Sequence, residues 1–170
     1  MKKIKLLILF LSLTCAVISS CKKSDNPLDP NNPPGGTATN NIVINGGGYT
    51  NASIGNIFEN VSFDSNGVTT VGIGGRINQD TTYVLAQFTG ITTGTYQFNN
   101  SNILLVGLRY SGGTFQSVYT SGTQGSIVVT KYERTSGGKV EGRFNATLLN
   151  RNNPNDSITV NATSFSATRR

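Results

Sequence analysis

Apolar and polar side chains alternate along most of the chain beyond its N-terminal quarter. The clearest run is residues 139–148, where Val140 and Phe144 share one side of the run and charged or polar residues occupy the positions between. A period of two residues is typical of an antiparallel strand with one buried face. Residues 126–134 alternate in the same way, and a Ser-Gly-Gly turn at residues 136–138 separates the two runs. We therefore predict a hairpin here.

Shorter segments with the same alternation are separated by Gly, Asn, Asp and Ser, and no segment shows a helical period. About nine or ten short strands predict an all-β fold, and we expect an antiparallel β-sandwich, with a closed or partly open β-barrel as the alternative. A break in the alternation at Thr163 and Ser164 favours the sandwich, because a bulge there would bend the last strand at a corner of the sheet. The expected strands outside the hairpin are residues 42–46, 57–63, 68–77, 82–89, 95–98, 102–110, 114–120 and 157–168.

The first twenty residues have the three parts of a secretory signal peptide. Lys2, Lys3 and Lys5 precede an apolar run at residues 6–13, and small residues follow that run. The apolar run is shorter than the roughly 20 residues that span a bilayer as a helix. We therefore expect a cleaved leader.

The end of this leader, Val-Ile-Ser-Ser-Cys at residues 17–21, resembles the lipobox of bacterial lipoproteins. The resemblance implies that Cys21 becomes the first mature residue, with a diacylglyceryl thioether and an amide-linked third acyl chain such as palmitate. Cys15, the other cysteine, lies in the leader, so a mature Cys21 has no disulfide partner. At about 0.8 kcal/mol for each buried methylene, two or three chains would hold the protein on a membrane.

The chain divides into three expected regions. Residues 1–20 are the signal peptide, residues 21–41 are a spacer, and residues 42–170 are one all-β domain. The spacer contains four of the five prolines and a single large apolar residue, Leu28, so its composition does not support a packed core. The domain is long enough for one core but not for two.

Three segments of the domain resemble the last strands of uncharacterised small lipoproteins of Bacteroidota: residues 125–132, 139–144 and 157–165. The resemblance implies an all-β domain at the cell envelope, most simply on the outer membrane, and it implies no activity. Which face of the membrane the domain occupies stays open.

Composition and charge exclude several classes of function. The chain has no His and no Trp, and only Cys21 would remain as a mature cysteine, so a metal site or a nucleophile that needs imidazole or paired thiolates is not expected. The formal charge is +6, from 14 basic and 8 acidic residues, but three of the basic residues lie in the leader. The mature charge is then 11 − 8 = +3, which does not support nucleic-acid binding.

The carboxylates suggest one enzyme class, a glycan hydrolase, which needs two of them facing each other across a cleft. Glu59 and Asp64 are five residues apart, so on one unbroken strand they would point to opposite faces. Glu133 and Glu141 would lie on neighbouring hairpin strands among basic residues, where cross-strand charge pairing explains them. We therefore expect no catalytic residues and no cofactor.

Aromatic residues suggest a binding role, and those that could supply stacking platforms for sugar rings are Tyr83, Tyr96, Tyr110, Phe115, Tyr119 and Tyr132. Tyr110 and Tyr119 flank the turn at residues 112–113 and could meet across one hairpin, where aromatic rings would stack on sugar rings. Core packing is the alternative explanation for aromatic residues on strands. The sequence thus predicts a lipid-anchored envelope protein whose domain is a non-catalytic binding or structural module for a glycan or an envelope protein. A carboxylate-dependent secreted hydrolase and a β-barrel carrier of a small apolar ligand are the alternatives.

Overall fold

The computed structural model describes residues 40–170, and within that range the chain forms ten strands and no helix. The expected leader, Cys21 and nearly all of the expected spacer lie outside the described residues. The strands are β1 (Asn41–Gly46), β2 (Tyr49–Ser53), β3 (Gly55–Ser65), β4 (Val68–Ile77), β5 (Asp80–Thr89), β6 (Gly94–Gln97), β7 (Ile103–Ser111), β8 (Thr114–Tyr132), β9 (Lys139–Asn150) and β10 (Ser157–Arg169).

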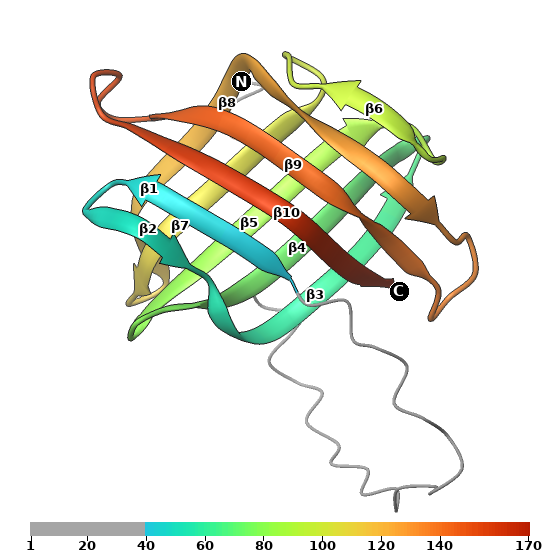
Figure 1. Ribbon diagram of the computed structural model, residues 1–170, viewed down its shortest axis with the longest axis horizontal. Helices are drawn as coiled ribbons and strands as arrows, with labels where there is room; N and C mark the ends of the chain where they lie inside the picture. The colour runs from blue at the N-terminus through green and yellow to red at the C-terminus, as the bar shows by residue number, and fades with distance from the viewer. Residues whose placement is uncertain (1–39) are drawn as a thin grey trace, which may run out of the picture. The chain divides into compact units, whose positions relative to one another are not determined.

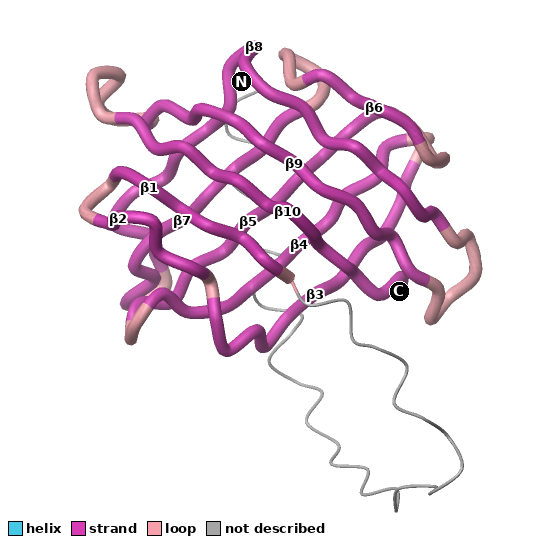
Figure 2. The backbone as a smooth tube through the Cα atoms, in the orientation of Figure 1, coloured by secondary structure: helices cyan, strands magenta, loops and turns pink. Residues whose placement is uncertain are grey.

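The strands form two layers that face each other, as Figure 1 shows. β3, β4, β5 and β7 make the back layer, β1, β2, β9 and β10 make the front layer, and the strands of one layer cross those of the other (Figure 2). Hydrogen bonding follows the order β2-β1-β10-β3-β4-β5-β7-β8-β6, and β9 pairs with both β8 and β10. The predicted all-β antiparallel fold is confirmed, and the continuous pairing also fits a partly open barrel.

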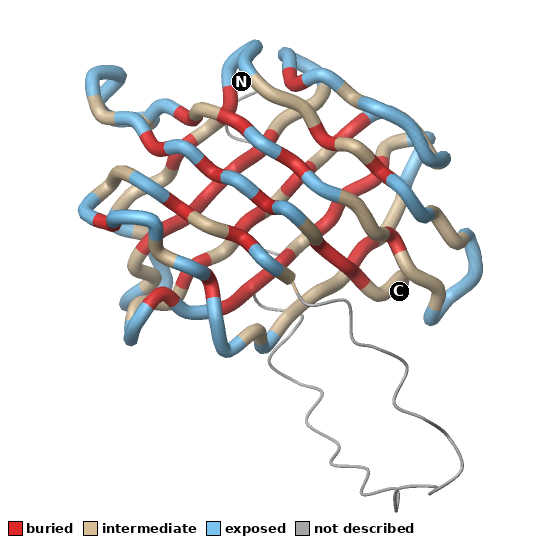
Figure 3. The backbone as a smooth tube through the Cα atoms, in the orientation of Figure 1, coloured by how far each residue is buried: buried red, intermediate tan, exposed pale blue. Residues whose placement is uncertain are grey.

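The core lies between the layers and is filled by alternate residues of each strand, which appear as regularly spaced buried positions in Figure 3. On β4 these are Val71, Ile73 and Ile77, and on β9 they include Val140 and Phe144. Removing each such side chain from water contributes about 1.5–3 kcal/mol. The same alternation sends the residues between them to the outer surface of each layer.

β8 is a single strand of 19 residues, where the sequence predicted two. Its first part pairs with β7 of the back layer, its last part pairs with β6, and β9 of the front layer pairs with residues 119–132. The register with β9 shifts between Ser121 and Gly125, and Gly125 has a positive φ of 108°. This irregularity bends the strand from one layer to the other without ending it.

Two other features of the strands bear on the sequence analysis. The register between β9 and β10 shifts between Ala162 and Phe165, which confirms the bulge predicted at Thr163 and Ser164. β2 was not predicted, because Tyr49–Ser53 contains mostly polar residues and has only Tyr49 buried.

The two layers also meet where the last strand reaches β3. This closing seam is the parallel part of the sheet and consists of two residue pairs, Thr168 with Val61 and Arg169 with Ser62. The guanidinium of Arg169 forms an ion pair with the carboxylate of Asp64, and it donates a hydrogen bond of 3.1 Å to the Tyr132 hydroxyl.

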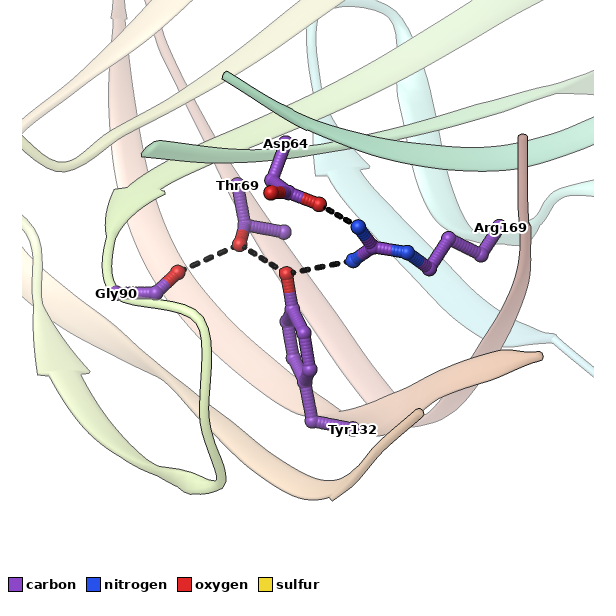
Figure 4. A network of polar contacts seen from close by, with 5 residues as sticks. All are labelled: Asp64, Thr69, Gly90, Tyr132 and Arg169. Atoms are coloured by element: carbon purple, nitrogen blue, oxygen red, sulfur yellow. Dashed lines mark hydrogen bonds and ion pairs between the residues drawn. The ribbon is translucent and has the colours of Figure 1, made fainter. Parts of the chain in front are cut away.

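Figure 4 shows that the polar contacts continue from this seam into β4. The Tyr132 hydroxyl is 2.7 Å from that of Thr69, which donates to the carbonyl oxygen of Gly90. Side-chain contacts therefore supplement the short backbone pairing, since they join β3, β4, β8 and β10.

Candidate functional site

The outer surface of the back layer carries two rows of residues in register. Their neighbours along β4, β5 and β7, such as Ile73, Val84 and Val106, belong to the core, so the members of these rows point away from it. The first row is Glu59, Gly74, Tyr83 and Gly107, and the second is Val61, Gly72, Leu85 and Leu105.

This surface is apolar for an outer face. Val61 and Leu85 are half-buried and Leu105 is 4% exposed, and none of the three belongs to the hydrophobic cluster that fills the space between the layers. Outward positions of an antiparallel sheet that faces water are usually polar. The back layer is thus apolar on both of its faces.

Four aromatic side chains lie in contact on this surface, and we call them the aromatic row: Phe58, Tyr83, Phe115 and Tyr110. The ring centroids of Phe58 and Tyr83 are 5.5 Å apart, and those of Tyr83 and Phe115 are 5.8 Å apart, both in edge-to-face geometry. The ring centroids of Phe115 and Tyr110 are 4.9 Å apart, and the angle between the two ring planes is 55°. Such spacings are favourable for aromatic pairs. Phe58 is the most exposed member, at 52%.

Two glycines determine where these rings lie. A Cβ atom at Gly107 would lie 2.6–2.8 Å from three atoms of the Phe115 ring, which shows that this ring covers the backbone of Gly107. A Cβ atom at Gly74 would lie 2.6 Å from Phe58 and 2.8 Å from Tyr83. Any larger residue would displace the rings, so the glycines let the aromatic row lie directly on the sheet.

The tyrosine hydroxyls divide into two groups. Those of Tyr49, Tyr96, Tyr119 and Tyr132 all form hydrogen bonds within the domain. Tyr83 and Tyr110 form none within residues 40–170, and both belong to the aromatic row. Burial, with a smaller contribution from the Glu59 carboxylate, raises the pKa of Tyr83 above its usual range, so its phenol is neutral and able to donate a hydrogen bond.

The structure separates the two tyrosines that the sequence singled out. Tyr110 pairs across the hairpin with Phe115, whereas Tyr119 pairs with Val106. Tyr119 is 1% exposed, and its hydroxyl donates a hydrogen bond of 2.7 Å to Asp156. Burial and this bond raise the pKa of Tyr119. Tyr110 therefore lies on the candidate surface, while Tyr119 belongs to the core.

The carboxylates are held by neighbouring cations and donors. Asp64 pairs with Arg169, and the Glu59 carboxylate, whose side chain is 12% exposed, lies 4.0 Å from the Arg170 guanidinium. Glu133 lies 3.1 Å from the Lys131 ammonium and accepts a hydrogen bond from the backbone N–H of Lys139, which lowers the pKa of Glu133. These contacts give each of the three carboxylates a structural role.

A second polar cluster lies where β5 begins. The Tyr49 hydroxyl donates to Asp80 at 2.6 Å, and Arg109 contacts both: its Nε is 3.5 Å from Asp80 and its guanidinium carbon lies 4.9 Å from the centroid of the Tyr49 ring. Burial, followed by the bond to Asp80, raises the pKa of Tyr49 to about 12. Arg109 also donates to the carbonyl oxygen of Gly47. The cluster holds the β1–β2 turn against β7.

The outer surface of the front layer differs from that of the back layer. Asn145 and Asn161 face each other across β9 and β10, and both are exposed. They share the lining of two adjoining shallow depressions of about 170 and 290 Å³. Hydroxyl and amide groups dominate this surface, so the aromatic character is confined to the back layer.

Within residues 40–170 no group of three or more His, Cys, Asp or Glu residues could hold a metal ion. The same part of the chain contains no apolar helix of membrane-spanning length. Comparisons of the chain with protein families, with curated proteins and with solved structures find no match.

Sequence reasoning found part of this site. Tyr110 was a candidate because it flanks a turn, and Tyr83 and Phe115 were among the aromatic residues that could stack on sugar rings, but Phe58 was not predicted and nothing set Tyr83 and Phe115 apart from the other aromatic residues. The signal that could have found them is the presence of Gly74 and Gly107 at outward positions of strands that are otherwise rich in large residues. A glycine at such a position often marks a place where another group lies against the backbone.

Proposed function

We propose that this chain is a lipid-anchored protein of the cell envelope whose all-β domain is a non-catalytic binding module, and that the aromatic row is its binding surface. The observation that carries the proposal is the apolar outer face of the back layer. Large apolar patches on soluble domains mark interaction sites. Aromatic residues, which combine a large contact area with few rotatable bonds, dominate the energetics of binding surfaces.

The placement of the carboxylates favours a binding module over a hydrolase. Asp64 is engaged by Arg169, and its register partner on β4, Thr69, is fully buried. Glu59 lies near the middle of the same strand, beside Arg170. A catalytic pair would face one open cleft with a site for substrate between the two groups.

The packing favours a binding module over a carrier with an internal ligand. Phe88, Phe98, Tyr119 and Phe165 are at most 1% exposed and fill the space between the layers. The two depressions described above lie on the outside of the sheet. A carrier would need a lined cavity in place of these side chains.

The location is supported by the lipobox-like residues 17–21 and by the length of chain between Cys21 and β1. About 20 residues reach at most roughly 70 Å when fully extended. Such a spacer would let an anchored domain turn its back layer toward other envelope components.

Site-specific photo-cross-linking tests the proposed surface. The substitution Phe58→p-benzoylphenylalanine places a photoreactive ring on the aromatic row, and Leu149→p-benzoylphenylalanine is the matched control, because Leu149 is 44% exposed on β9 of the front layer. Irradiation of intact cells that produce the protein should give adducts from position 58 and not from position 149. Absence of adducts at position 58, or equal labelling at both positions, would contradict the proposal.

A further inference from the structure

The chemistry of the aromatic row restricts what it binds. Phe58, which is half exposed, offers ring surface to an apolar group, while the Tyr83 and Tyr110 hydroxyls have no hydrogen-bond partner within the described residues. The centroids of neighbouring rings in the aromatic row are 4.9–5.8 Å apart, so apolar ring surface and phenol hydroxyls lie close together. A ligand that satisfies them must present apolar surface and hydroxyl-type groups in close alternation.

The charge of this face restricts the ligand further. In the two outward rows the charged residue is Glu59, and the Arg170 guanidinium lies 4.0 Å from its carboxylate. Thr70, Gln87 and Ile103 continue the outward surface of β4, β5 and β7 in one direction without charge, and in the other direction Arg76 and Thr81 continue it with a single cation. An anionic headgroup, a nucleic acid or an acidic peptide would find no cluster of cations there.

We infer that the ligand of the aromatic row is a neutral glycan chain, an inference that rests on the proposed function of this surface. The C–H groups on one face of a pyranose ring form an apolar patch that packs on an aromatic ring, and its equatorial hydroxyls pair with the free phenols and with the Gln87 amide. Acyl chains would leave the phenols of Tyr83 and Tyr110 unpaired, at a cost in affinity. A neutral glycan meets the apolar, the hydrogen-bonding and the charge requirements together.

The glycines give the surface its rigidity. Because Phe115 covers the backbone of Gly107, and Phe58 and Tyr83 meet over Gly74, the rings are placed before the ligand arrives. A surface that is ordered in advance loses less conformational entropy on binding.

Affinity electrophoresis and isothermal titration calorimetry of the full chain, purified in detergent, test the inference. The probes are four neutral polysaccharides (hydroxyethyl cellulose, xylan, galactomannan and dextran) and one acidic polysaccharide, polygalacturonate. We expect binding to at least one neutral polysaccharide and none to polygalacturonate. Phe58→Ala should weaken that binding about tenfold or more, because it removes a ring that is half exposed and supports little of the fold.

Two further variants separate the contribution of the phenol from that of the ring position. Tyr83→Phe keeps the ring and removes the hydroxyl, and it should weaken binding about fivefold through the lost hydrogen bond. Gly107→Ala keeps every aromatic residue but displaces the Phe115 ring, and it should weaken binding by at least as much. Gly122→Ala is its control, because a Cβ atom there would meet nothing within 4 Å, and Leu149→Ala is the control for Phe58→Ala. Circular dichroism establishes that each variant is folded.

The outcomes separate this inference from the proposed function. If no neutral polysaccharide binds, or if binding is unchanged in Phe58→Ala and Tyr83→Phe, the glycan inference is wrong. If position 58 still cross-links to a protein or peptide, the binding surface stands with a different ligand. If position 58 gives no adducts either, both proposals are wrong.

Discussion

Arg169 and Asp64 form an ion pair that joins the last strand, β10, to β3 at the closing seam. Their side chains are 14% and 24% exposed, whereas the Arg170 and Glu59 pair next to them has one side chain that is 58% exposed. Backbone pairing at this seam extends over only two residue pairs. The partly buried side-chain network therefore matters more here than at the longer antiparallel pairings.

The first prediction concerns this seam. Arg169→Ala removes the ion pair with Asp64 and the hydrogen bond to Tyr132, and it leaves a partly buried carboxylate without its cation. We expect a loss of about 1–3 kcal/mol in the free energy of unfolding, measured by urea denaturation. Arg170→Ala is the control and should cost less than about 1 kcal/mol, because its side chain is 58% exposed and its guanidinium lies as far as 4.0 Å from the Glu59 carboxylate. Equal losses in the two variants would contradict this role of the seam.

The second prediction concerns the bend in β8. Gly125 has a positive φ, and a Cβ atom there would overlap the carbonyl oxygen of Asn145 and lie 2.7 Å from the Cα atom of Ala146. Gly125→Ala should therefore destabilise the fold by about 2–4 kcal/mol. Gly122→Ala, three residues earlier in the same strand, should change stability by no more than about 0.5 kcal/mol. Thermal unfolding of both variants makes the comparison, and a mild effect at Gly125 would show that the bend tolerates a side chain.

The third prediction concerns alkaline pH. The pKa of Tyr49 is raised to about 12 in the folded protein, above the value near 10 of an unfolded tyrosine. Its contribution to stability is complete below the unfolded pKa and is lost as pH rises from about 10 to about 12. Tyr49→Phe has no such proton to lose, so its unfolding midpoint in urea should fall less over this interval than that of the original chain. Identical pH dependence of the two chains would exclude Tyr49 as the cause.

The fourth prediction concerns acidic pH. Hydrogen bonds from Asn150 and Tyr119 lower the pKa of Asp156 in the folded protein. As pH falls, the unfolded state therefore binds the proton before the folded state does. The contribution of the ionised Asp156 carboxylate to stability is fully present above the unfolded pKa near 4 and declines as pH falls below it. Asp156→Asn should be less stable than the original chain at pH 7 and should lose less on acidification. Unfolding of both chains is monitored by tyrosine fluorescence. If the two chains lose the same stability on acidification, Asp156 does not contribute to the acid dependence.

The fifth prediction concerns the anchor. Cys21→Ala should leave the chain uncleaved or release it from membranes, while Cys15→Ala, within the leader, should leave processing and fractionation unchanged. Mass spectrometry of the N-terminal peptide of the original chain should find two or three acyl chains on Cys21. A free thiol at that residue would overturn the lipid proposal.

The strand pattern was predictable because it depends on local alternation and on turn residues. Asn66 and Gly67 have φ values of 51° and 77° in the β3–β4 turn, as their sequence suggests. The bulge before Phe165 was visible as a break in the period. The continuation of β8 through Gly122 and Gly125 was not, because glycines at a bend and glycines at a turn look the same in a sequence.

Alternation along this sequence determined that the domain is built of antiparallel strands, which residues of each strand share a face, and where most turns lie. Only the tertiary structure decided that Phe58, Tyr83 and Phe115, from β3, β5 and β8, meet on one outer surface, and that Tyr119 is buried while Tyr110 is not. The physical reason is that the period of a strand distinguishes its two faces but does not say which one is covered. That depends on which strands pair, in which register, and on where β8 bends from one layer into the other.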